Sequence, residues 1–252
     1  MLFTFIRMFR GILRLIILCV CFAKLAYAQI NTYYQLCSTQ FENALQAIQK
    51  EDWSMAQHAF KTYLQTCNQA ETKEAAAYYI AYAALKMNQK DGPWLLRNFA
   101  EHAQSAEWQY KAYLNLGRYY FNQKKFDKAA RYFDTIPQHT LTKTYFAEIT
   151  FKKAYAYLML QQTDLARDLF YKLRQDSGEY YQASVFYHAH IAYSQNQFSL
   201  ARQLFKEIEA NSSFKPLIPN YIFQMDYLDG AYEEVVKNGV QLLMDSAQIQ
   251  SS

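Results

Sequence analysis

Apolar residues recur along most of the chain at the three- and four-residue spacing that places them on one face of a helix. Short polar segments interrupt this pattern, among them Asn122-Gln123-Lys124-Lys125 and Ser194-Gln195-Asn196-Gln197. A helical period broken by short polar turns predicts amphipathic helices that return on each other as antiparallel hairpins. The pattern therefore predicts a succession of helix pairs and an all-α fold.

A short motif recurs four times within this pattern. An aromatic residue or Thr is followed three positions later by Ala, and a Phe follows four positions after that Ala. A second small residue lies twelve positions before the Ala. The four copies run from Trp53 to Phe60, Phe126 to Phe133, Thr163 to Phe170 and Phe198 to Phe205, and their preceding small residues are Ala44, Gly117, Ala154 and Ala189. Self-similarity at a regular period predicts a repeat architecture.

Two further copies are degenerate. One has Ala81 with Leu95 and Phe99, its turn lengthened around Asp91-Gly92-Pro93, and the last has Tyr232-Glu233-Glu234-Val235 with Leu242 downstream. The phenylalanines at positions 60, 99, 133, 170 and 205 are spaced 39, 34, 37 and 35 residues apart. A helix pair of this size cannot bury its apolar stripe alone, so neighbouring pairs are expected to stack and cover it in series.

The sequence resembles the tetratricopeptide repeat (TPR) family, whose period is about 34 residues. Tyr113-x-x-Leu116-Gly117-x-x-Tyr120 followed by Ala129-x-x-x-Phe133 is similar to the family signature, with Tyr in place of its Trp. Ala154-x-x-Tyr157 with Ala166-x-x-x-Phe170 is nearly as close, although Lys153 stands where the family usually has Leu. The first and fifth copies keep the small residues and the Phe but lack the Tyr. The resemblance covers most of residues 37 to 245.

This resemblance implies a right-handed superhelical solenoid of antiparallel helix pairs, with five to six hairpins over residues 29–252. In such a fold Gly117 and Ala129 let the two helices of a pair approach closely, while Tyr120 and Phe133 fill the seam between that pair and the next. The positions predicted to pack the repeats are Gly117, Tyr120, Ala129, Phe133, Ala154, Tyr157, Ala166, Phe170, Ala189, Ala201 and Phe205.

The same resemblance implies a groove that binds a protein or peptide ligand and is lined by the first helix of each pair. The chain is rich in aromatic residues, with 23 Tyr and 18 Phe, and most of them are expected to pack helix against helix. The side chains expected to line the groove are Arg118, Asn122, Phe151, Tyr155, Met159, Phe186, His190 and Tyr193.

The first 28 residues have a different composition. Arg7, Arg10 and Arg14 precede an apolar run from Leu15 to Ala23, and the small-residue pattern Ala26-Tyr27-Ala28 follows. This order is typical of a secretory signal peptide cleaved after Ala28, which predicts export to the periplasm or cell envelope. A retained leader that anchors the chain to the membrane is the alternative, although the apolar run is far shorter than the roughly 20 residues that span a bilayer. Lipidation at Cys21 fits poorly because Val20 precedes it.

The leader also carries the excess positive charge. The whole chain has a formal net charge of +4, and residues 1–28 contain four Lys or Arg and no acid, so residues 29–252 are formally neutral. A nucleic-acid-binding protein needs a concentrated basic face to neutralise phosphates. The sequence therefore disfavours a nucleic-acid partner.

Two cysteines, Cys37 and Cys67, remain after the leader. In the expected first hairpin one lies at the start of a helix and the other at the end of its antiparallel partner, so a disulfide is geometrically reasonable in an oxidising compartment. Two separately buried thiols are the alternative.

No motif in the sequence indicates catalysis or a cofactor. A glycine-rich phosphate loop, a Gly-x-Ser-x-Gly elbow and a His-Glu-x-x-His helix are all missing. His188 and His190 are two residues apart on a helix and should point to different faces, so they do not predict a metal site. No catalytic, cofactor-binding or metal-ligating residue is assigned.

The sequence thus predicts a non-enzymatic scaffold that binds protein or peptide and assists assembly of an envelope complex. Two alternatives are an exported glycan-binding protein built on a TPR frame and the helical part of a cell-wall enzyme. The last residues, Asp245 to Ser252, are polar, as expected of a capping segment. Dimerisation or continuation of the chain beyond Ser252 could cover the last repeat instead.

Overall fold

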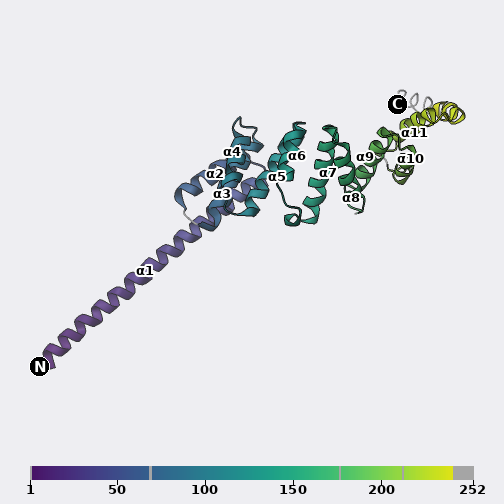
Figure 1. Cartoon of the computed structure of the whole chain (residues 1–252). Coiled ribbons are helices and arrows are strands. Elements are labelled where there is room, and N and C mark those ends of the chain that lie inside the picture. The colour runs from purple at the N-terminus through teal and green to yellow at the C-terminus, as the bar shows by residue number, and fades with distance from the viewer. Residues whose placement is uncertain (1, 68–69, 176, 212, 241–252) are drawn as a thin grey trace. The chain divides into compact units, whose positions relative to one another are not determined.

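The computed structural model describes residues 2–67, 70–175, 177–211 and 213–240, and the regular elements in these ranges are helices. They are α1 (Leu2–Gln49), α2 (Trp53–Thr66), α3 (Ala70–Lys86), α4 (Gly92–His102), α5 (Ala106–Asn122), α6 (Phe126–Asp134), the 3₁₀ helix η1 (Gln138–Thr140), α7 (Lys143–Met159), α8 (Thr163–Arg174), α9 (Tyr181–Ser194), α10 (Phe198–Glu207) and α11 (Ile218–Leu228). A further helical segment spans residues 232–240. The described ranges contain no β-strand, which confirms the predicted all-α class (Figure 1).

The helices form two compact units, Met1–Ala112 and Tyr113–Ser252. In the first unit α1 packs on α2, α2 on α3 and α3 on α4. In the second unit α6 packs on α7, and the contacts continue in chain order through α8, α9 and α10 to α11 (Figure 1). Within each unit these helices thus contact the next helix in sequence, as predicted for stacked helix pairs.

Helix α1 contains both the predicted leader and the first helix of the first repeat. Its side chains from Tyr27 to Leu36 are exposed, and burial begins at Cys37. The side chains of the leader's arginines, its apolar run and Cys21 lie outside the described residues, as do Leu242 and the polar tail from Asp245 to Ser252. Among the helices that the structure describes, none combines the length and apolar character needed to cross a membrane.

The turn inside each helix pair has the same backbone geometry. One residue adopts a left-handed conformation, with φ between 53° and 75°, and the N–H of the next residue donates to a carbonyl five positions back, as in a Schellman cap. The left-handed residues are Glu51, Asn88, Lys124, Gln161, Asn196 and Gly230. They recur every 34 to 37 residues and include both degenerate copies, so the turns follow the register of the sequence repeat.

We expect substitution of Gln161 by Gly to stabilise the protein. A residue with a side chain is destabilised by about 1 kcal/mol or more in the left-handed region, and Gly is not. Part of this gain is lost because Gly gives up more backbone entropy on folding. Gln161→Gly should therefore raise the free energy of unfolding in a urea titration by about 0.5–1 kcal/mol. The same change at Gln203, exposed inside α10, should lower it by about 1 kcal/mol. A loss of stability in both variants would contradict this reading of the turn.

Small residues bring the two helices of a pair together. A Cβ atom added to Gly117 on α5 would lie 2.7 Å from Cδ1 and 2.9 Å from Cζ of Phe133 on α6, so the ring fills the space that the missing side chain leaves. The alanines at the corresponding positions are fully buried: Ala44, Ala56, Ala129, Ala154, Ala166, Ala189 and Ala201. Close helix contact at these positions is what the motif predicts.

The seam between consecutive pairs is formed by an aromatic stack. At three seams the motif Phe at the end of one pair packs on a Tyr of the first helix of the next. Phe60 lies flat on Tyr79 with the ring centroids 5.0 Å apart, and Phe170 lies flat on Tyr187 at 5.4 Å. Phe205 packs on Tyr221 at 4.8 Å, with the two rings tilted by 31°. Tyr120, which was predicted to fill a seam, stacks instead on Tyr132 of its own pair at 5.6 Å. Tyr157 reaches the preceding pair, because its hydroxyl donates to Asp134 at 2.8 Å.

Candidate functional site

The first helices of the pairs in the second unit carry the side chains predicted to bind a ligand. Arg118 and Asn122 lie on α5, Phe151, Tyr155 and Met159 on α7, and Phe186, His190 and Tyr193 on α9. We call these residues, together with Phe121 on α5, Tyr187 on α9 and Tyr221 on α11, the first-helix row. Contacts between consecutive first helices connect the row, and they differ in kind along it.

The α5 end of the row is charged. Arg118 Nε donates to Glu148 Oε1 at 2.8 Å, and Lys152 Nζ donates to the same oxygen at 2.7 Å. Burial alone would raise the pKa of Glu148, but the hydrogen bonds and charges of Arg118 and Lys152 outweigh it and lower the pKa to about 2. The guanidinium also lies 5.4 Å from the ring centroid of Tyr145. Two cations face one carboxylate, so this end of the row is positive.

The middle of the row consists of half-buried aromatic rings. Tyr155 on α7 contacts Phe121 on α5 edge to face, with ring centroids 5.7 Å apart, and Tyr187 on α9 in the same way at 5.3 Å. Phe151 on α7 contacts Phe170 edge to face, with the ring centroids 5.8 Å apart. The rings of three first helices are therefore in mutual contact while each keeps part of its surface open to solvent.

Met159 and Asn122 are the open members of the row. Met159 is 43% exposed in the last turn of α7, and Asn122 is exposed at the end of α5. These two side chains border the aromatic rings and could contact a ligand without any rearrangement of the core.

Phe186 belongs to the core and does not line an open surface. It is 7% exposed and stacks on Phe214 with the ring centroids 4.7 Å apart, while Tyr221 of α11 lies edge to face against it at 6.0 Å. The prediction of Phe186 as a groove residue therefore needs correction. The segment between α10 and α11 covers a side chain that the helical register of α9 alone would leave open.

The α9 end of the row is held to α11 by hydrogen bonds. His190 Nδ1 and the Tyr221 hydroxyl are 2.9 Å apart, and the Tyr193 hydroxyl donates to Gln224 Oε1 at 2.5 Å. Burial lowers the pKa of His190. These bonds fix the aromatic rings in place and leave the row polar at this end.

His188 points away from His190, toward α8. It lies 3.4 Å from Arg174 and contacts the Tyr171 ring edge to face, whereas His190 faces α11. Burial, followed by the charge of Arg174, lowers the pKa of His188. In the part of the chain that the structure describes, no group of three His, Cys, Asp or Glu side chains could hold a metal ion.

We expect the stability of the protein to fall as the pH drops below about 6.5, the pKa of His in an unfolded chain. Because the pKa values of His188 and His190 are lowered in the folded state, the unfolded chain takes up more protons in this range, and acid favours it. Arg174 and Arg167 oppose protonation of His188, while Glu207 and Asp168 partly offset them. The lowered pKa of Glu148 destabilises the protein mainly below pH 4.5, its pKa in the unfolded chain, and so contributes little in this window.

Urea titrations at pH 7.5 and pH 5 would measure this dependence. His188→Gln together with His190→Gln should reduce the difference between the two pH values. Leu165→Ala, at an exposed position of α8 that does not titrate, should leave the difference unchanged. An undiminished pH dependence in the double variant would assign the effect to other groups.

The fold and the first-helix row define a class of protein, the helical repeat proteins built from antiparallel helix pairs. Among solved structures, the chain is similar to the C-terminal part of a TPR repeat-containing protein from Cytophaga hutchinsonii (TM-score 0.59, 16% identity, covering 82% of this chain and 79% of that one). It is also similar to PilF from Pseudomonas aeruginosa (TM-score 0.56, 14% identity, covering 83% of this chain and 91% of that one). A tetratricopeptide repeat protein from Parabacteroides merdae is similar too (TM-score 0.57, 11% identity, covering 83% of this chain and 80% of that one).

At these identities the likeness establishes the fold, and it confirms the TPR architecture that the motif from Tyr113 to Phe133 indicated. No protein-family model matches the sequence, and no curated protein matches it.

Proposed function

We propose that this protein is a non-enzymatic scaffold that binds a segment of another protein along the first-helix row of its second unit, within the cell envelope. The observation that carries this proposal is the continuous contact of partly buried rings from α5, α7 and α9, through Phe121, Tyr155 and Tyr187. Aromatic rings provide contact area at little cost in side-chain entropy, which suits recognition of a peptide. The similar TPR structures are consistent with an interaction scaffold.

The chemistry of the two ends of the row supports a polypeptide ligand. Arg118 and Lys152 make one end positive, and Tyr193 and His190 offer polar groups at the other. A peptide has apolar side chains for the rings and backbone amides and carbonyls for these polar groups. A ligand that spans α5 to α9 would therefore find both kinds of partner along its length.

Site-specific photocrosslinking in cells would test this function. A photoreactive amino acid at Met159 or Asn122 should crosslink a discrete protein, and Met159→Asp in a chain that carries the probe at Asn122 should weaken that crosslink. The control position is Leu165, 51% exposed on the second helix α8. Equal crosslinking from Leu165 and Met159 would count against the row.

The proposed location in the cell envelope rests on the leader and on the cysteines. Arg7, Arg10 and Arg14, the apolar run and Ala26-Tyr27-Ala28 have the order of a cleavable secretory signal. A disulfide between Cys37 and Cys67 fits an oxidising compartment. Cell fractionation with N-terminal sequencing should find the protein in the periplasm beginning at Gln29, and a cytoplasmic protein beginning at Met1 would refute the assignment.

A further inference from the structure

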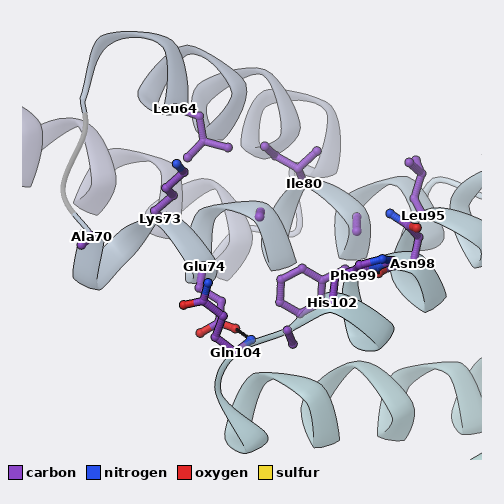
Figure 2. Close-up of a pocket in the computed structure, with 13 residues that line it drawn as sticks. Leu64, Ala70, Lys73, Glu74, Ile80, Leu95, Asn98, Phe99, His102 and Gln104 are labelled. Atoms are coloured by element: carbon purple, nitrogen blue, oxygen red, sulfur yellow. Dashed lines mark hydrogen bonds between the residues drawn. The ribbon is translucent and has the colours of Figure 1, made fainter.

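A groove in the first unit lies between α3, α4 and the end of α2, outside the first-helix row (Figure 2). Its volume is about 520 Å³, within the range of sites that bind ligands. Its floor is hydrocarbon, formed by Leu64, Ala77, Ile80, Ala81, Leu95 and Phe99. Figure 2 shows Ile80 and Phe99 on opposite sides of this space and Leu64 closing it from α2.

Small residues and one glycine shape the groove. At the turn between α3 and α4 a Cβ atom on Gly92 would lie 2.8 Å from the Ala84 carbonyl oxygen, so the two helices are in backbone contact there. Toward the other end, where α3 begins and α4 finishes, the facing residues Ala70, Ala77 and Ala103 are too small to fill the space between the helices. The groove therefore results from the close contact of α3 and α4 at Gly92 and from the small alanine side chains where the two helices separate.

Two charged side chains, Glu74 and Lys73, lie on the rim of the groove and differ in their hydrogen bonding. Glu74 Oε1 accepts the backbone N–H groups of Gln104 at 2.6 Å and Ser105 at 3.0 Å, which fixes the turn between α4 and α5 (Figure 2). Lys73 is exposed, and it makes no hydrogen bond or ion pair with any residue that the structure describes. His102 is also exposed, and its Nδ1 donates to the Asn98 carbonyl at 2.8 Å. Lys73 is therefore the rim group that could pair with a carboxylate of a ligand.

We propose that this groove binds an amphipathic segment of a protein partner, which inserts large apolar side chains onto the floor and places an Asp or Glu beside Lys73. A small molecule would need to be enclosed over most of its surface, whereas Lys73, Asn98, His102 and Gln104 are exposed and leave the groove open along its rim. A helix laid into an apolar groove satisfies this geometry with residues spaced three and four apart. This site is independent of the first-helix row and would give the scaffold a second point of attachment.

Selection from a displayed library of random helical peptides, on the full chain with its disulfide intact, tests the proposal. The selected peptides should carry a large apolar residue within one turn of an Asp or Glu. Lys73→Glu, on the surface, should weaken these peptides about tenfold and turn a new selection toward Lys and Arg. Ala77→Trp, which fills the floor, should weaken them at least tenfold.

Met159→Asp in the second unit separates the two proposals, because it should leave these peptides unaffected while it weakens any ligand of the first-helix row. Selected peptides that show no acidic preference, or that bind Lys73→Glu and Ala77→Trp as well as the parent chain, would overturn the inference. If no peptide is selected and dodecanoate binds saturably to the parent chain but not to Ala77→Trp, the groove would be an acyl-chain site instead. A dimer of the chain that Ala77→Trp dissociates would assign it to a second copy.

Discussion

Replacing Phe170 by Ala should lower the free energy of unfolding of the second unit by about 3–5 kcal/mol. The ring is fully buried, and it belongs to a cluster with Ala154, Ala166 and Ile191. It also stacks on Tyr187 and meets Phe151 edge to face, so it joins one helix pair to the next. Its removal leaves a cavity at the seam and exposes rings that neither pair can cover alone.

The positions of the three tryptophans allow unfolding of the first unit to be followed separately from unfolding of the second. Trp53, Trp94 and Trp108 all lie in the first unit, so their fluorescence reports unfolding of that unit, while far-UV circular dichroism reports both. Phe170→Ala should shift the dichroism transition to lower urea. Leu165→Ala, on the exposed side of the same helix, should change it by less than about 0.5 kcal/mol. Equal effects of the two substitutions would show that the seam does not stabilise the stack.

The elements and their register could be predicted from the sequence because they depend on local requirements. A small residue is needed where two helices touch, and a polar turn where they reverse, and both recur at a fixed distance from the motif Phe. Even the copy around Ala81, whose turn is longer, keeps a left-handed residue at Asn88. The signature from Tyr113 to Phe133 therefore gave the right fold class without any knowledge of contacts.

The partners across the seams were missed. Tyr79, Tyr187 and Tyr221 follow their phenylalanines by 19, 17 and 16 residues, so the spacing varies with the length of each connection. A search for a Tyr in this window after each motif Phe would have found them. Since the connection between two pairs has no fixed length, the motif alone does not specify which residue meets the ring.

The row itself could be predicted only in part for a related reason. Helix α9 is apolar around most of its circumference, with Val185, Ile191 and Ala192 buried along with Ala189 on the motif face, so no single face stands out. Phe214, from outside any predicted helix pair, covers Phe186. The groove between α3 and α4 requires residues from three helices and gave no sequence signal.

Loss of the disulfide between Cys37 and Cys67 should lower the free energy of unfolding of the first unit by about 3–4 kcal/mol, because the bond closes a loop of 30 residues. The structure joins the two residues, which the sequence left either bridged or separate, with Cα atoms 5.7 Å apart. Both are buried in one cluster with Phe60 and Tyr63 in the first repeat, where α1 packs chiefly on α2 within the described residues. An end repeat gains more from a crosslink than an inner one because it is covered on one side only.

Protein refolded with reductant should unfold at a lower urea concentration than oxidised protein, as measured by tryptophan fluorescence. The urea midpoint of the double variant Cys37→Ala with Cys67→Ala should not change when reductant is added. In the chain-entropy model the bond acts on the unfolded chain, by restricting the conformations available to it. The reduced protein should therefore retain its helical dichroism without urea and lose only its resistance to unfolding. A midpoint that stays unchanged while two thiols are titrated would mean that packing of Phe41 and Phe60 between α1 and α2 holds the first repeat without the bond.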